Sequence, residues 1–207
     1  MTSSPDIPVA ILAAGRASRF GGGKLDAICA GKPLGRWVLE AAAAAGLSPG
    51  FLIVGPQPPA FAEEALYDGW SLITNPHPEE GLGTSVALAA AHADCLRVDA
   101  LVLLLADMPL TSVETIRALL DHMPLTAPVA TRYRSGRPGV PARFPASLFG
   151  ALAGLHGDRG ASTLLRARPD LHLLDPPLDS LLDVDDADDL ARAEALLSAT
   201  KPPAHRP

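Results

Sequence analysis

The 207-residue sequence contains few aromatic side chains (4%), only two cysteines and no long apolar segment. Cys29 and Cys95 lie far apart and do not follow a metal-site spacing, so we expect two buried free thiols rather than a disulfide. The longest apolar run, residues 100–106, is too short to cross a membrane, and residues 1–8 lack the features of a secretion signal. We therefore expect a cytoplasmic protein that does not bind membranes.

Basic residues are also in the minority. The 17 Lys and Arg residues against 23 Asp and Glu residues give a net charge of -6, which disfavours nonspecific binding to nucleic acids or anionic membranes. This balance still permits a local basic pocket. A composition of 48% hydrophobic and 19% charged residues is typical of a globular protein, and the length suits one sizeable domain.

Short apolar runs alternate with helical patterns along the chain. Strands are expected at residues 8–13, 51–55, 71–74, 100–106, 128–131 and 171–174. Helices are expected at residues 33–46, 83–94, 112–123, 145–155, 160–167 and 186–199. Most of the strand runs lack polar alternation, as expected for strands covered on both faces.

This alternation predicts an α/β fold with a doubly wound, mostly parallel sheet in a single domain. The domain would span residues 7–199, between a frayed N-terminus at residues 1–6 and a flexible tail at residues 200–207. Ligands of such sheets bind beyond the carboxyl ends of the strands. The segments that carry chemistry should therefore follow strands.

A glycine-rich segment, LAAGRASRFGGGK at residues 12–24, includes the end of the first expected strand and continues beyond it. It holds four glycines, two arginines and a lysine, with no acidic residue, and it matches neither the P-loop nor the GxGxxG pattern. Its glycines let backbone N–H groups approach a ligand closely, and Arg16, Arg19 and Lys24 suit phosphate oxygens. Two interpretations are possible: a loop that binds a polyanion, or a solvated surface loop without a ligand.

Two acidic segments follow later in the chain. Asp107 ends the most hydrophobic strand, where it is either a metal ligand or a turn or N-cap residue. Residues 181–190 place Asp183 and Asp185 on an expected short strand, and three further aspartates begin the last helix, where the helix dipole favours acids. An EF-hand is rejected, because Asp188 stands where the required glycine would be.

Three further segments have two possible roles each. Gly83, Thr84 and Ser85 precede or begin an expected helix, where Thr84 or Ser85 would be either an N-cap or a nucleotide contact. Residues 136–144 and 155–162 are rich in glycine and proline, so we expect shaped loops that either pack or contact a second substrate.

These segments carry a family resemblance. Residues 12–24 resemble the L-A-A/G-G-x-x-S-R-M-G-x-x-K signature of MobA-like nucleotidyltransferases, with Phe20 in place of methionine. Residues 103–110 resemble the L-x-x-D-x-P motif of that family, and residues 183–190 resemble D-I/V-D-T-P-E-D-L, departing at T-P-E. The resemblance covers residues 8–197 and implies a Rossmann-like GT-A nucleotidyltransferase fold.

The resemblance also implies roles for individual residues. The expected nucleotide-binding residues are Leu12, Ala13, Ala14, Gly15, Ser18, Arg19, Lys24, Gly83 and Ser85. Lys24, Arg19 and Asp107 would act in catalysis, with the two cations on the phosphates. Asp107 and Asp185 would bind Mg²⁺, with Asp183 as the alternative second ligand.

For the second substrate, residues 136–144 and 155–162 resemble segments of the molybdenum cofactor cytidylyltransferase branch of the family. Val140 and Ser162 stand where that branch has histidine and arginine, which removes polar groups plausibly used on the acceptor. The remaining acceptor-binding candidates are Arg137, Gly139, Asp158 and Arg159.

Ala14 bears on the nucleotide, since residues 12–15 read LAAG as in the cytidylyl branch, whereas the guanylyl branch reads LAGG. The implied reaction moves CMP from CTP onto molybdenum-molybdopterin and releases pyrophosphate, and a molybdoenzyme or its chaperone would receive the product. One alternative is a related transferase that uses GTP, ATP or another small phosphorylated acceptor. A non-catalytic nucleotide or cofactor carrier and a glycosyltransferase also remain open.

Overall fold

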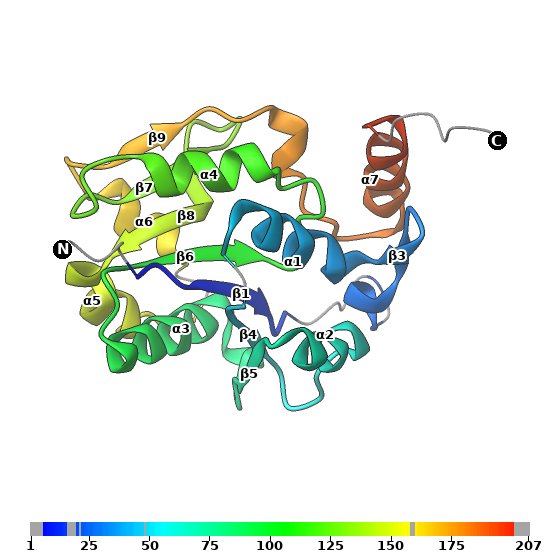
Figure 1. Cartoon of the computed structure of the whole chain (residues 1–207), viewed down its shortest axis with the longest axis horizontal. Coiled ribbons are helices and arrows are strands. Elements are labelled where there is room, and N and C mark those ends of the chain that lie inside the picture. The colour runs from blue at the N-terminus through cyan, green and yellow to red at the C-terminus, as the bar shows by residue number, and fades with distance from the viewer. Residues whose placement is uncertain (1–5, 16–19, 21, 48, 158–159, 201–207) are drawn as a thin grey trace.

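The computed structural model describes residues 6–15, 20, 22–47, 49–157 and 160–200 (Figure 1). Seven strands form one sheet in the order β5-β4-β1-β6-β8-β7-β9. These strands are β1 (Val9–Ala13), β4 (Phe51–Val54), β5 (Ser71–Thr74), β6 (Ala100–Leu105), β7 (Val129–Arg132), β8 (Pro138–Pro145) and β9 (His172–Leu174). All neighbouring pairs are parallel except those of β8, which runs antiparallel to β6 and β7. The predicted mostly parallel α/β sheet is confirmed.

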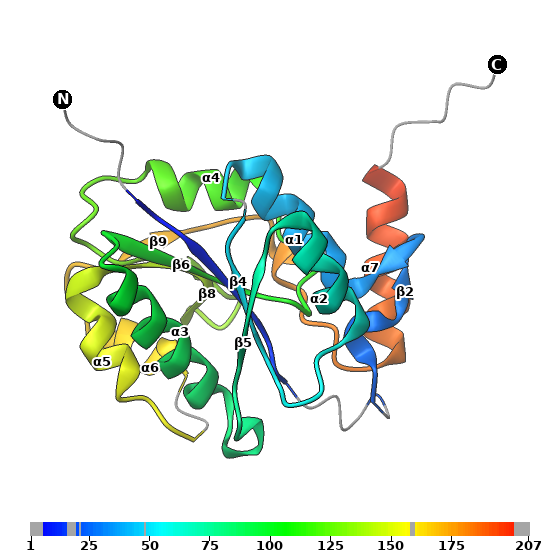
Figure 2. The same ribbon diagram turned by 60° about the horizontal axis from the view of Figure 1, so that its bottom comes forward.

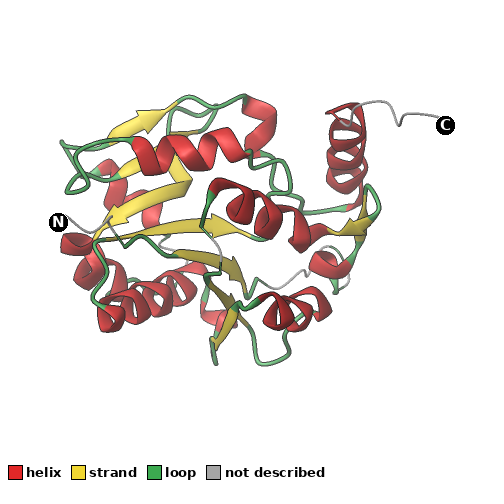
Figure 3. Ribbon diagram, in the orientation of Figure 1, coloured by secondary structure: helices red, strands yellow, loops and turns green. Residues whose placement is uncertain are grey.

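Helices cover both faces of this sheet (Figures 2 and 3). The helices are α1 (Leu34–Ala45), α2 (Ala60–Ala65), α3 (Leu82–Leu96), α4 (Val113–Asp121), α5 (Phe149–Ala153), α6 (Ala161–Arg166) and α7 (Ala187–Thr200). Alternate residues of β1 divide between two hydrophobic cores. Val9 and Ile11 pack with α1, α2, α4 and α7, whereas Ala10 and Leu12 pack with α3, α5 and α6. Burial on both faces explains why the strand runs lack polar alternation.

The segment that we expected to be a shaped loop, residues 136–144, largely forms the strand β8. All eight of its residues are buried, and Ala142 pairs with Leu103 of β6 and with Ala130 of β7. The prolines of this segment argue against a strand because proline cannot donate to a ladder. A register shift after Ala130 leaves Val140 and Pro141 outside the ladder with β7, which makes a proline tolerable there.

Other local expectations are corrected as well. Asp183 and Asp185 do not lie on a strand, since residues 182–186 have no regular helix or strand. β5 is an edge strand with two exposed and two half-buried residues, so it is not a buried strand. A short hairpin of β2 (Ile28–Cys29) and β3 (Lys32–Pro33) was not expected, nor was α2.

Helix α7 extends to Thr200. Of the ends expected at residues 1–6 and 200–207, residues 1–5 and 201–207 lie outside the described residues. Both cysteines are free, but only Cys29 is buried, so the expectation of a buried thiol is wrong for Cys95. Within the described ranges, we find no helix whose length and apolar character would suit a membrane span.

A buried arginine holds the end of α4 against the sheet. Arg143 of β8 is fully buried and donates hydrogen bonds to the carbonyl oxygens of Leu120, His122, Pro124 and Ala127. The ring of His122 lies 4.2 Å from that of His172, measured between centroids. Burial lowers the pKa of His122, and the charges of His172 and Arg143 lower it further.

This cluster predicts that the protein loses stability in mild acid. The pKa of His122 in the folded state lies below its ordinary value of 6.5. Between these two pKa values, the unfolded chain therefore binds more protons than the folded protein. The contribution of neutral His122 is complete above pH 6.5 and is lost as the pH falls through the folded pKa. We expect the urea midpoint of unfolding of the wild type to decrease when the pH is lowered from about 7.5 to about 5.5. The decrease should be smaller in His122→Asn. The exposed His77→Asn serves as control and should behave as the wild type.

Candidate active site

The glycine-rich segment and both acidic segments meet beyond the carboxyl ends of β1 and β6. They enclose a cavity of about 300 Å³. Its lining consists of Leu12, Ala13, Ala14, Gly15, Lys24, Leu25, Leu82, Ser85, Leu105, Asp107, Asp183 and Asp185. At β1 the strand order reverses, because β4 and β5 are added on one side of it and β6 on the other. The cavity lies at this reversal, which is the usual ligand position in a doubly wound sheet.

Lys24 is the central cation of this cavity. It begins a short helix, η1 (Lys24–Asp26), and the preceding Gly23 has a φ of 65°, a left-handed conformation that favours glycine. The Nζ atom of Lys24 lies 2.9 Å from Oδ2 of Asp107 and 3.5 Å from Oδ1 of Asp185. The Lys24 side chain is only 10% exposed, whereas those of Asp107 and Asp185 are 28% and 57% exposed, so the lysine is shielded from water but Asp185 still reaches the solvent.

A backbone hydrogen bond brings the two acidic segments together. The N–H of Val184 donates to the carbonyl oxygen of Asp107 at 3.0 Å. Because Val184 is flanked by Asp183 and Asp185, this bond places both carboxylates beside Asp107. The segment is also fixed at the start of α7, where Asp189 accepts from the N–H of Asp185 and donates its own N–H to the side chain of Asp186.

Asp183 has an unusual environment. Its Oδ1 atom is buried and has no hydrogen-bond partner within the described part of the chain. Burial raises the pKa of its carboxyl to about 7, and the neighbouring charges of Asp107 and Asp185 contribute to the rise. A buried carboxylate oxygen without a donor needs a cation or a proton.

The donor set fits a divalent cation in part. Among the described residues, no group of three or more His, Cys, Asp or Glu side chains is arranged to hold a metal ion. Magnesium in phosphate-transfer sites, however, is usually held by one or two carboxylates together with substrate phosphates and water. Asp107 and Asp185, with the unpartnered oxygen of Asp183 beside them, therefore suit an ion whose other ligands come with the substrate.

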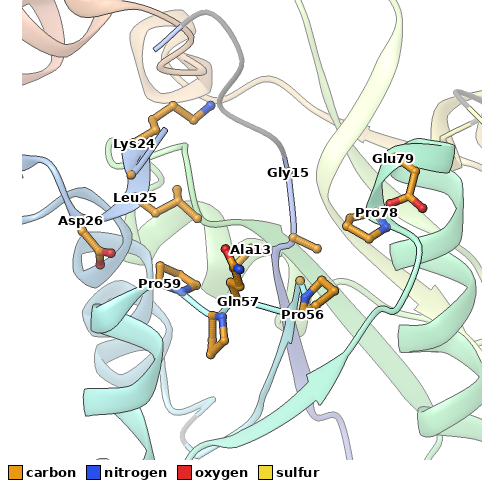
Figure 4. Close-up of a pocket in the computed structure, with 14 residues that line it drawn as sticks. Ala13, Gly15, Lys24, Leu25, Asp26, Pro56, Gln57, Pro59, Pro78 and Glu79 are labelled. Carbon is orange, nitrogen blue, oxygen red and sulfur yellow. The ribbon is translucent and has the colours of Figure 1, made fainter. Parts of the chain in front are cut away.

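A second, larger cavity of about 600 Å³ opens on the other side of the glycine-rich segment (Figure 4). It shares Ala13, Ala14, Gly15, Lys24 and Leu25 with the first cavity. Its other walls are Gly23, Asp26, Gly55, Pro56, Gln57, Pro58, Pro59, Pro78 and Glu79. Figure 4 shows Lys24 on one side of this pocket and Glu79 on the other. Residues 55–59 were not predicted as part of the site, although they lie at the end of the expected strand at 51–55 and directly after it, where ligands of such sheets bind.

Asn75 is another residue that the sequence analysis did not single out. It is buried at the end of β5 and donates to the hydroxyl oxygens of Thr84 and Ser85, both at 2.9 Å. Neither hydroxyl residue is the N-cap of α3, because that position is held by Gly81. Ser85 lines the smaller cavity. Asn75 therefore fixes the side chain of a predicted nucleotide contact.

Gly83 lies beside the loop that follows α5 and is not among the lining residues of either cavity. Its N–H donates to the carbonyl oxygen of Gly157 at 2.9 Å, and a Cβ atom at this position would lie 2.8 Å from the same oxygen. The close contact requires glycine whether or not a nucleotide also touches it.

The predicted acceptor residues are only partly described. Gly139 is buried under the ring of Tyr133, whose hydroxyl donates to the carbonyl oxygen of Val140 at 2.6 Å. Arg137 is exposed on the turn between β7 and β8. Neither Gly139 nor Arg137 lines the two cavities. Five predicted residues lie outside the described part of the chain: Arg16, Ser18, Arg19, Asp158 and Arg159.

Asp26 joins the turn of Lys24 to the wall of the larger cavity. Its two carboxylate oxygens accept the N–H groups of Ala60 and Phe61, both at 2.9 Å, at the start of α2. We expect Asp26→Ala to lower the free energy of unfolding by about 1 kcal/mol, because it removes this cap. Since η1 would be less restrained, nucleotide affinity measured by calorimetry should fall as well.

The control for Asp26→Ala is Glu64→Ala, which also removes one negative charge, at an exposed position of α2 outside its first turn. It should change neither the unfolding free energy nor the affinity. Unchanged nucleotide binding in Asp26→Ala would mean that this carboxylate does not support the Lys24 turn.

This arrangement of sheet, glycine-rich segment and carboxylates defines an α/β domain of the nucleotidyltransferase class. Residues 9–172 match the model of the MobA-like NTP transferase domain. The match covers more than half of the chain, and the chain therefore belongs to the MobA-like NTP transferase family.

Individual relatives agree with this assignment. The purine catabolism protein PucB of Bacillus subtilis strain 168 is 32% identical over 172 residues, which cover 79% of this chain and 82% of PucB. The crystal structure of Rv0371c from Mycobacterium tuberculosis H37Rv has 30% identity and a TM-score of 0.77, covering 94% of this chain and 100% of that one. A manganese complex of Rv0371c matches with 28% identity and a TM-score of 0.71, over 93% of this chain and 99% of that one.

Proposed function

We propose that the protein transfers a nucleotidyl group from a nucleoside triphosphate to a small phosphorylated acceptor, with Mg²⁺ as cofactor, and releases pyrophosphate. The observation that carries the proposal is the contact of Lys24 with Asp107 and Asp185 inside a cavity at the carboxyl ends of β1 and β6. Family membership supports it, as does the manganese complex of the relative Rv0371c.

In this proposal the triphosphate lies along the glycine-rich segment, with Lys24 and Arg19 offsetting its charge. Asp107 and Asp185 hold the cation, with Asp183 as the alternative to Asp185. Bound there, Mg²⁺ would neutralise charge on the triphosphate. The nucleoside would occupy the larger cavity, whose volume of about 600 Å³ leaves room for a base and a ribose.

The reaction needs no strong general base. A phosphate monoester on the acceptor is already largely ionised near neutral pH, and it would attack the α-phosphorus in line while pyrophosphate leaves. The protein's contribution is then alignment of the two substrates and charge neutralisation by Lys24 and Arg19.

We infer CTP as the favoured nucleotide. Ala14 lines both cavities, and its methyl group would narrow the base pocket against a purine. The matching acceptor is molybdenum-molybdopterin, with Arg137, Asp158 and Arg159 as the candidate contacts, since Gly139 is buried under the Tyr133 ring. A molybdoenzyme or its chaperone would receive the product. Since the relative PucB is named for purine catabolism, a transferase with another nucleotide or acceptor is the second candidate. A non-catalytic nucleotide carrier is the third.

The first experiment is calorimetry of CTP, GTP and ATP binding in the presence of Mg²⁺, followed by pyrophosphate release with molybdopterin as acceptor. Tight CTP binding with pyrophosphate release supports the whole proposal. A preference for GTP or ATP would remove the argument from Ala14 and leave the transferase class. Nucleotide binding without transfer to any phosphorylated acceptor would favour the carrier.

A further inference from the structure

The lysine of the glycine-rich segment touches the carboxylates that are the proposed metal ligands. The Nζ atom of Lys24 is 2.9 Å from Asp107 and 3.5 Å from Asp185, and the three side chains come from segments that are up to 161 residues apart. The lysine side chain is largely buried, and its ammonium group lies within reach of both acids. Lys24 is therefore already the counter-ion of this pair of carboxylates.

A divalent cation and the Lys24 ammonium cannot share these carboxylates without bringing like charges together in a partly buried site. For the cation to bind, the ammonium group has to leave. It has a place to go, because Lys24 lines both cavities and has a flexible four-carbon stem. Its destination on the glycine-rich side is the position proposed for the triphosphate.

We propose that Lys24 is an internal competitor of the divalent cation for Asp107 and Asp185, and that nucleotide phosphates draw it away from them. The statement that nucleotide phosphates draw Lys24 away rests on the proposed function. Its consequence is positive coupling: the nucleotide strengthens cation binding, and by linkage the cation strengthens nucleotide binding to the same degree. Without nucleotide, the ion pairs of Lys24 keep the affinity for the cation low.

A purely structural ion pair would behave differently. If Lys24 only held the acidic segments in place, its removal would let them separate and would weaken cation binding. If Lys24 competes with the cation, the same change removes the competitor at Asp107 and Asp185 and strengthens cation binding. The sign of the change therefore separates the two roles without any measurement of catalytic activity.

The test is a titration of the full chain with Mn²⁺ in the absence of nucleotide. Electron paramagnetic resonance measures the concentration of free Mn²⁺ and so gives the affinity. We expect Lys24→Met to bind Mn²⁺ about 10- to 100-fold more tightly than the wild type, in the usual range of coupling between sites. Lys24→Arg keeps the charge and should keep the weak binding. The matched control Lys32→Met removes a lysine charge that is paired with Glu40 in the β3–α1 region, and it should leave Mn²⁺ affinity unchanged.

The coupling is measured separately with a non-hydrolysable NTP analogue, by comparing its affinity with and without Mn²⁺. We expect Mn²⁺ to increase the affinity of the wild type for the analogue. In Lys24→Met, this increase in affinity should be about fivefold smaller. Unchanged or weaker Mn²⁺ binding by a folded Lys24→Met, as judged by its circular dichroism and melting curve, overturns the competitor role. Because the Mn²⁺ measurement contains no nucleotide, this failure is distinct from a wild type that binds no NTP, which would overturn the proposed function.

Discussion

Replacing Asp107 by asparagine is expected to lower the rate of nucleotidyl transfer at saturating substrate by about 10²- to 10³-fold. The change removes a negative charge at the end of β6, where the carboxylate lies 2.9 Å from Lys24 and beside Asp183 and Asp185. The asparagine side chain has the same size. The hydrogen bond from the N–H of Val184 uses the backbone oxygen of Asp107 and is unaffected. Lys24 keeps its ion pair with Asp185, so the loss in pyrophosphate release should far exceed what any change in the melting temperature explains.

The matched control is Asp188→Asn, which makes the same change of charge at an exposed position in the first turn of α7. It should keep the wild-type rate. If Asp107→Asn retains more than about a tenth of the activity while its fold is intact, this carboxylate is not part of the catalytic site, since losses at such positions are larger.

The core strands were predictable because strands that are buried on both faces consist of continuous apolar runs. β1 and β6 are buried on both faces, and each is a continuous apolar run in the sequence. β8 could not be predicted in the same way. Its prolines and glycine are locally unfavourable for a strand, and it is a strand only because β6 and β7 flank it in the folded sheet.

The site shows the same division between local and long-range information. The glycine-rich segment and the two acidic segments were identified as motifs, and the structure brings Lys24, Asp107, Asp183 and Asp185 into one cavity. The Lys24–Asp107 contact joins residues 83 positions apart, and no local pattern encodes it. The walls at residues 55–59 carry no charge, so nothing except their place after a strand marks them. Asn75 was not predicted for another reason: its role depends on the hydroxyl groups of Thr84 and Ser85, which follow it by 9 and 10 residues in the sequence.

Close packing between α1 and α2 supports the side of the site that carries the larger cavity. Gly35 of α1 and Phe61 of α2 are both buried, and a Cβ atom at Gly35 would lie inside the van der Waals distance of the Phe61 ring. Phe61 is also one of the two residues whose N–H groups bind Asp26. A displaced ring would therefore disturb the link between α2 and the Lys24 turn as well as the core.

Gly35→Ala is expected to lower the free energy of unfolding by about 2 kcal/mol, because overpacking of the Phe61 ring outweighs the gain in helix propensity. For a chain of this length, the melting temperature should fall by about 4–8 °C. Gly150→Ala is the matched control: Gly150 is also helical, but it is exposed and a Cβ atom there meets nothing within 4 Å. That variant should gain about 0.5 kcal/mol from the restricted unfolded chain. Thermal and urea unfolding of both variants measure the difference, and a Gly35→Ala protein as stable as Gly150→Ala would show that the Phe61 ring can move aside at no cost.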